Sequence, residues 1–152
     1  MKVKKTATPN FDNINPTGCV NAKLRRLHRL LNQQYQKAYK PFGLQGTMVP
    51  IMFIVGKMPG INQKTIAQRL VLDQSTMSRD IQKLQTKGWI TAEKGTDPRN
   101  SELYVTNEGY KVLEKVAPVW EKMHQQTSTL LGSFNIQLID QLTMAIQQFQ
   151  AK

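Results

Sequence analysis

The stretch Ile66–Ile90, IAQRLVLDQSTMSRDIQKLQTKGWI, contains two short amphipathic segments in immediate succession. Apolar residues recur at steps of three and four in each segment, which is the spacing of a helix with one buried face. Asp73 is a favourable N-cap between the two segments, and Gly88 is a favourable stop for the second. The stretch therefore predicts two helices joined by a tight turn.

A β-hairpin is predicted directly after this pair of helices. Two runs rich in β-branched and aromatic residues, WITAE (Trp89–Glu93) and ELYVT (Glu102–Thr106), flank the sequence KGTDPRNS (Lys94–Ser101). Within it, the dipeptide Asp97-Pro98 marks a turn. Helix, turn, helix and hairpin in this order are the arrangement of a winged helix-turn-helix, whose second helix can lie in a DNA major groove.

The second helix has a polar outward face. At ~100° per residue, Met77, Ile81 and Leu84 gather on one side, and Asp80 lies near them, where Lys83 or Lys87 can pair with it. The opposite side and its flanks carry short polar groups and cations: Ser75, Ser78, Arg79, Gln82, Lys83 and Thr86. Such groups hydrogen-bond base edges and phosphates, although any amphipathic surface helix has a face of this kind. The adjoining helix and hairpin favour the DNA interpretation.

The whole chain is predicted to be mainly α with a small β-hairpin wing. Residues 1–17 read as a flexible N-terminal arm, and residues 18–152 as a single domain. The winged helix-turn-helix covers about 44–106, and flanking helices cover about 18–40 and 107–150. Thr106 is expected to cap the second flanking helix, and Asn135 is expected to cap a last helix after Gly132.

The net charge of +11 is unevenly distributed along the chain. Residues 1–100 hold 17 Lys and Arg against 5 Asp and Glu, whereas residues 101–152 hold 4 against 5. A half-molecule this basic favours a polyanionic partner, because each cation placed on a phosphate releases condensed counterions. The alternative is a solvated basic surface that binds nothing.

Several classes of protein are disfavoured by composition. No apolar run approaches the ~20 residues of a membrane span, so no membrane partner is expected. The N-terminus lacks the features of a secretion signal, and the single cysteine, Cys19, cannot form an intramolecular disulfide, so a cytoplasmic location is expected. No nucleophile–base pair, glycine-rich phosphate loop or paired carboxylates stand at useful spacing. We expect neither an enzyme nor a bound cofactor.

From roughly Lys23 to Phe149 the sequence resembles the MarR family of bacterial transcriptional regulators. The segment Ile66–Ile90 resembles the family's helix, turn, Ser-Thr-x-[Thr/Ser]-Arg recognition helix and Lys-Gly-[Leu/Trp]-Ile exit. The segment DPRNSELYVTNEG (Asp97–Gly109) resembles its wing signature. This resemblance implies a homodimer whose N- and C-terminal dimerisation helices pack together and whose winged helices bind double-stranded DNA.

The resemblance also implies roles for individual residues. Ser75, Thr76, Ser78 and Arg79 match the positions that meet the major groove. In the wing, Arg99 matches the arginine that enters the minor groove, and Asp97 matches the acidic residue that holds it. The expected DNA-binding set is Gln74, Ser75, Thr76, Ser78, Arg79, Gln82, Lys83, Asp97 and Arg99. Between Gly88 and Asp97 the chain is about one residue shorter than the common pattern, which predicts a shorter or differently tilted wing.

Many relatives in this family bind lipophilic or phenolic effectors where the dimer helices meet the winged helix. The corresponding residues here are Leu31, Tyr35, Met48 and Met52, although methionines at such positions are more often core residues. Cys19 is either a redox sensor or a bystander. The two histidines, His28 and His124, lack neighbours at metal-ligand spacing, so no metal site is expected.

The predicted function is therefore that of a sequence-specific DNA-binding regulator, a ligand-responsive repressor that acts as a homodimer on a near-palindromic operator. The alternative is a winged-helix module that binds a protein partner without reading DNA sequence.

Overall fold

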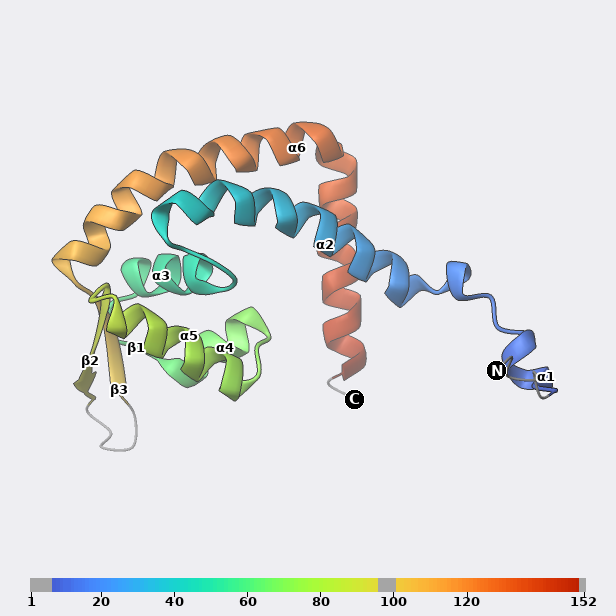
Figure 1. The fold of residues 1–152 in the computed structure, drawn as a ribbon, viewed down its shortest axis with the longest axis horizontal. Coiled ribbons are helices and arrows are strands. Elements are labelled where there is room, and N and C mark those ends of the chain that lie inside the picture. Colours follow the sequence, from blue (N-terminus) through green and yellow to red (C-terminus); the bar gives the residue numbers. More distant parts are fainter. Residues whose placement is uncertain (1–6, 96–100, 151–152) are drawn as a thin grey trace, which may run out of the picture.

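The computed structural model describes residues 7–95 and 101–150. It confirms a mainly helical chain with a small β-sheet (Figure 1). Its elements in chain order are α1 (Pro9–Asp12), α2 (Val20–Tyr39), α3 (Met48–Lys57), β1 (Ile61–Asn62), α4 (Gln63–Leu70), α5 (Gln74–Thr86), β2 (Ile90–Lys94), β3 (Ser101–Val105) and α6 (Asn107–Gln150), with short 3₁₀ turns at Pro16–Gly18 and Lys40–Phe42.

The winged helix-turn-helix is formed by α3, α4, α5 and a three-stranded antiparallel sheet of order β1-β3-β2. The predicted hairpin is present, with Ile90 opposite Val105 and Lys94 opposite Ser101. Strand β1 was not expected from the sequence. It has two residues, Ile61 and Asn62, and it pairs with the middle of β3. Two residues are too few for a periodic signal, so tertiary pairing alone defines this strand.

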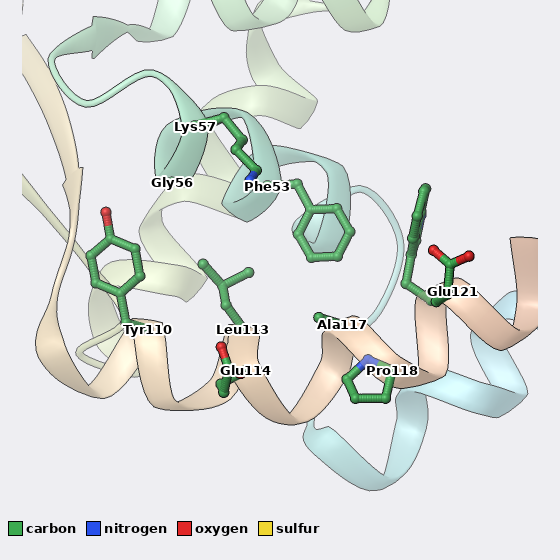
Figure 2. A pocket seen from close by; sticks show the side chains of 10 residues that line it. Phe53, Gly56, Lys57, Tyr110, Leu113, Glu114, Ala117, Pro118 and Glu121 are labelled. Atoms are coloured by element: carbon green, nitrogen blue, oxygen red, sulfur yellow. The ribbon is translucent and has the colours of Figure 1, made fainter.

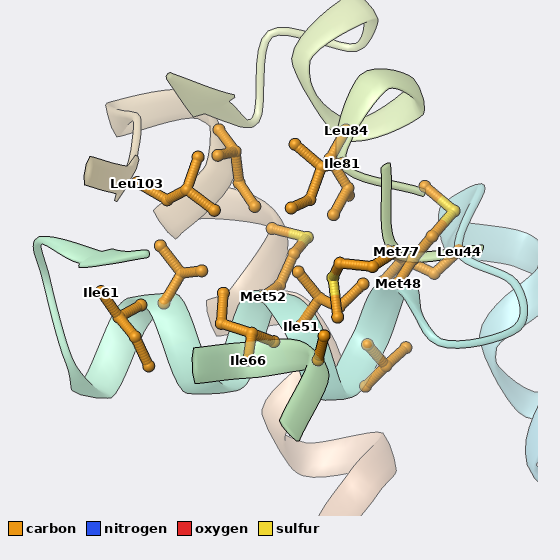
Figure 3. Close-up of a cluster of buried hydrophobic side chains, with 14 of the residues drawn as sticks. Leu44, Met48, Ile51, Met52, Ile61, Ile66, Met77, Ile81, Leu84 and Leu103 are labelled. Carbon is orange, nitrogen blue, oxygen red and sulfur yellow. The ribbon is translucent and has the colours of Figure 1, made fainter. Parts of the chain in front are cut away.

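The core lies where α3 crosses α4, α5 and the inner face of the sheet (Figure 3). Met48, Ile51 and Met52 of α3 are 0% exposed, as are Ile66 of α4, and Met77 and Leu84 of α5. The apolar face predicted for α5 is thus the buried face. Each such side chain contributes roughly 1.5–3 kcal/mol by leaving water, so this packing fixes α5 on the body of the winged helix.

Two of the three expected caps, Asp73 and Thr106, are present, and Asn62 caps α4 in the same way. The side chains of Asn62 and Asp73 accept hydrogen bonds from the backbone N–H groups of Thr65 and Thr76, and Thr106 accepts one from the N–H of Gly109. Asn135 does not cap a helix. It lies inside α6 and donates to the carbonyl of Leu131 at 2.8 Å, because the helix resumes directly after Gly132.

Gly109 lies against the end of the hairpin. A Cβ atom on this residue would come within 2.1 Å of the carbonyl oxygen of Trp89 and 2.7 Å of a methyl group of Val105. Neither backbone nor a buried methyl group can yield that much space. The glycine in the sequence Thr106-Asn-Glu-Gly109 therefore lets α6 begin in direct contact with β2 and β3.

The long helix α6 bends sharply, so that it has two limbs (Figure 1). The bend lies at Gly132, whose φ of 74° and ψ of 157° are outside the helical region. The first limb runs beside α2, and the hydroxyl of Tyr35 lies 3.3 Å from that of Thr127. Pro118 lies inside the first limb.

Two surfaces outside the winged helix expose large apolar side chains. On α2 these include Val20 (69% exposed) and Leu30 (54%), and on the second limb of α6 they include Phe134 (74%) and Phe149 (82%). In the segment predicted as an N-terminal arm, α1 and a 3₁₀ turn form, and all described side chains are exposed. Across the described residues, no helix combines the length and apolar character needed to cross a membrane.

Candidate nucleic-acid interface

The first turn of α5 is organised by one carboxylate. Asp73 accepts hydrogen bonds from the hydroxyl of Ser75 at 2.5 Å, from the hydroxyl of Thr76 at 2.7 Å and from the backbone N–H of Thr76 at 2.8 Å. These bonds, that of Ser75 first, hold the pKa of Asp73 well below its usual range. The cap is therefore ionised at neutral pH, and it fixes the two hydroxyl-bearing side chains at the start of the helix.

The outward face of α5 matches the predicted phasing. Gln74, Ser75, Ser78, Arg79, Gln82 and Lys83 are exposed, and Thr76 is half-buried. Arg79 folds back along this face, because its Nε donates to the carbonyl of Ser75 at 3.2 Å and its Nη2 lies 3.4 Å from the Ser75 hydroxyl. The structure thus brings seven of the nine predicted DNA-binding residues onto one helix. Asp97 and Arg99 of the predicted wing tip lie outside the described residues.

Helix α4 adds residues that the sequence did not single out. The amide of Gln63, at the start of α4, donates to the hydroxyl of Ser78 at 2.6 Å. Gln63, Lys64, Gln74 and Gln85 line a polar hollow of about 330 Å³ between α4, α5 and the sheet. For Gln63 and Lys64, the signal in the sequence is Asn62, because this residue caps α4 and thereby directs the first turn of that helix toward α5.

Asp80 connects α5 to the rest of the protein. Of the charged side chains in residues 7–95 and 101–149, it is the one classed as buried, at 8% exposure. It pairs with Lys83 at 2.9 Å, as the sequence suggested, and it accepts a short hydrogen bond from the hydroxyl of Thr47, which precedes α3. The neighbouring Gly46 is held in turn by the side-chain amide of Gln36 on α2. A continuous polar path therefore runs from α2 to α5.

Of the four residues considered for an effector pocket, the two methionines take the core position that the sequence also allowed. Met48 and Met52 are fully buried core residues, since α4, α5 and the sheet close over α3. Leu31 and Tyr35 are half-buried on α2. A cavity of about 640 Å³ is lined by none of the four. It lies between α3 and the first limb of α6, where Phe53, Leu113 and Trp120 form apolar walls and Lys57, Glu114 and Glu121 stand at its edges (Figure 2).

The remaining candidate residues show little sign of a chemical role. Cys19 is exposed at the start of α2. The ring of His124 stacks on that of Trp120 at 5.0 Å between centroids. Over the part of the chain that the structure describes, no three His, Cys, Asp or Glu side chains gather where a metal ion could be held.

Comparison with known proteins relates this region to a family. Residues 42–99, which include α3, α4, α5 and β2, match the family model described as MarR family. Over this region the chain is similar to the MarR family. A curated relative is the uncharacterized HTH-type transcriptional regulator YwoH of Bacillus subtilis, which is 26% identical over 88 residues. That match covers 58% of this chain and 64% of YwoH, so the chain spans less than two thirds of the relative's length.

Solved structures of MarR-family regulators share the fold over most of its length. MosR of Mycobacterium tuberculosis in complex with DNA superposes with a TM-score of 0.75 at 21% identity, covering 88% of this chain and 98% of that one. PcaV of Streptomyces coelicolor, solved with its natural ligand, gives a TM-score of 0.72 at 19% identity and covers 89% and 96%. The match extends to the flanking helices, beyond the winged helix alone.

The Asp80 contacts predict the effect of removing one of them. We expect Thr47→Val to lower the free energy of unfolding by about 1–3 kcal/mol, because the isosteric valine leaves a buried carboxylate oxygen without its donor. Urea denaturation followed by circular dichroism measures the change. Thr91→Val, on the exposed surface of β2, is the matched control and should stay within about 0.5 kcal/mol of wild type. Equal stabilities of the two variants would contradict the role given to Thr47.

Proposed function

We propose that this protein is a sequence-specific DNA-binding transcriptional regulator that reads the major groove with α5. The observation that carries the proposal is the exposed polar and cationic face of α5, opposite a face that is buried in the core. Arginine and glutamine side chains supply hydrogen bonds to base edges, and serine hydroxyls and lysines supply them to phosphates. Support also comes from YwoH, named as a transcriptional regulator, and from MosR, solved with DNA.

Electrostatics and the wing complete the proposed contact. The excess of cations in residues 1–100 provides the salt-dependent part of the affinity. By the family resemblance, Arg99 reaches the adjacent minor groove and Asp97 holds it in place. A narrow minor groove has an enhanced negative potential, so this arginine responds to DNA shape as well as to charge.

The regulator is proposed to act as a homodimer. The exposed apolar side chains on α2 and on the second limb of α6 form surfaces that a monomer leaves in water. Packing two copies through these surfaces places two α5 helices on one side of the dimer. Two-fold symmetry then requires a near-palindromic operator with half-site centres ~10 bp apart.

A small effector is proposed to release the repressor from DNA. The cavity between α3 and the first limb of α6 suits a lipophilic or phenolic molecule, because its walls are largely aromatic and aliphatic. It adjoins both the winged helix and the long helix, so a ligand there can favour one relative arrangement of the two. PcaV, a structural neighbour, was solved with its natural ligand.

The competing function is a winged-helix module that binds protein and has no DNA sequence preference. A competition assay with random genomic fragments at ~150 mM salt separates the two. Selective retention of a few fragments supports the regulator, and footprints on those fragments give the operator. Uniform weak binding to all fragments would support the interaction module instead.

Arg79→Ala tests the recognition helix. We expect operator affinity to fall by about 1–3 kcal/mol, with relaxed preference at one base pair if the guanidinium contacts a base edge. Fluorescence anisotropy with the selected fragment measures the loss. Lys122→Ala, which removes an exposed cation from α6, is the control. An unchanged affinity and sequence preference in Arg79→Ala would mean that another face of α5 meets DNA.

The double variant Leu142→Arg/Ile146→Arg tests the dimer. Both side chains are about half exposed on the second limb of α6, at 47% and 50%. Two charges there should prevent burial of this surface, so sedimentation should report a monomer that still has the wild-type helical content. Gln147→Arg, on the opposite side of the same limb, should remain dimeric. A dimeric double variant would move the interface elsewhere.

Ala117→Trp tests the effector cavity. The indole should occupy the space between α3 and α6, while α5 keeps its exposed face. Phenol at millimolar concentration should raise the melting temperature of the wild type, and the variant should lose this shift. Operator affinity should be similar for both proteins in the absence of phenol. A melting shift that survives the substitution would place phenol at another site.

A further inference from the structure

Helix α2 has two chemically opposite faces. At ~100° per residue, Val20, Leu24, Leu27 and Leu31 fall within about 60° of one another and form its apolar face. Between about 110° and 170° from the centre of that face lie five cations of α2 and of the residue that follows it, which we call the α2 basic face: Arg25, Arg26, Arg29, Lys37 and Lys40. Pairing of α2 with a second copy through its apolar face would leave the basic face on the outside of the dimer.

The charges of the α2 basic face are not neutralised within the described chain. All five side chains are exposed, and α2 itself contains no Asp or Glu. Among the residues the structure describes, no carboxylate pairs with any of them. At 1.5 Å per residue, the face from Arg25 to Lys40 extends over roughly 22 Å, which corresponds to about six phosphates of one DNA strand.

Three of these cations converge on one hollow. Arg25, Arg26 and Arg29 surround Ala22 and Cys19 at a surface hollow of about 460 Å³. The small side chain of Ala22 leaves room between the long arginines. Guanidinium groups bind phosphate through paired N–H donors, so this arrangement suits the oxygens of a sugar-phosphate backbone.

The three arginines of the face lie apart from α5, whereas Lys37 and Lys40 are at the end of α2 that leads into the winged helix. In Figure 1 the N-terminal half of α2 runs away from the winged helix, while α5 and the hairpin lie at the opposite end of the molecule. Leu30 (54% exposed) borders the α2 basic face beside Arg26 and Lys37, whereas Arg25 and Arg29 have no large exposed apolar neighbour on that side of the helix. A row of unpaired cations of this kind is typical of nucleic-acid backbone contacts.

We propose that the α2 basic face is a second DNA-binding surface, which holds the phosphate backbone of a duplex segment other than the one read by α5 and does so without sequence preference. The protein would then join two DNA segments. The inference rests on the proposed function only in assigning the first segment to α5.

The test is capture of a second duplex by the full chain. Wild-type protein is loaded on an immobilised 40-bp duplex of random sequence, and a fluorescent 40-bp duplex of different sequence is added at several salt concentrations. We expect retention of the second duplex to be lost in Arg25→Gln/Arg26→Gln/Arg29→Gln, while loading on the first duplex persists. The slope of log affinity against log salt for the second duplex should include about 2.7 from these three cations.

A charge-matched variant controls for net charge. Lys111→Gln/Lys115→Gln/Lys122→Gln removes three exposed cations from α6 and should retain capture. The proposal is overturned if wild type captures no second duplex, if the arginine variant captures as much as wild type, or if the lysine variant loses as much as the arginine variant. Failure of the regulator proposal has a different signature, since preference among genomic fragments would be absent while arginine-dependent capture remained.

Discussion

The carboxylate of Asp80 is buried between α5 and the loop before α3. It accepts a hydrogen bond from Thr47 and pairs with Lys83, and the orientation of α5 on the core depends on these contacts. A buried charge is tolerated only where its partners are in place, so this part of α5 has one well-defined position against the core. The apolar packing of Met77, Ile81 and Leu84 holds the helix against the core, whereas Asp80 determines its rotation and its position along the axis. Because Gln36 holds Gly46 beside Thr47, a shift of α2 would be transmitted to α5 through hydrogen bonds.

The exposed side of α5 is ordered by its own contacts in the absence of DNA. Ser75 and Thr76 are held by Asp73, Ser78 by Gln63, and Arg79 by Ser75. Contact with bases would exchange some of these bonds for new ones, so the net free energy gained from each new bond is smaller. The existing bonds nevertheless keep the side chains close to rotamers that can reach DNA. Ordering before binding reduces the entropy lost on association.

Local signals in the sequence were sufficient to predict the helices and the exposed polar face of α5. Capping by Asp73 and Thr106 and the phasing of Ser75 and Arg79 depend on neighbours within four residues, so the sequence contains the information directly. The two-residue strand β1 could not be predicted, because it exists only through its pairing with β3. The sequence left open whether Met48 and Met52 line a pocket or belong to the core for a related reason, since which face of α3 meets the core is decided by α4, α5 and the sheet together. Asn135 was misassigned because Gly132 lets the helix resume at once and leaves no position for a cap three residues later.

Gly132 also fixes a relation between the two limbs of α6. Its φ of 74° and ψ of 157° belong to a region that residues with a Cβ atom avoid, so the bend stays at this position in the chain. A one-residue insertion after the glycine would rotate the rest of the second limb by ~100° and advance it by ~1.5 Å. Its apolar side chains would then point in a different direction relative to the first limb. The bend therefore sets the register of the second limb, which a substitution keeps and an insertion directly after the glycine changes.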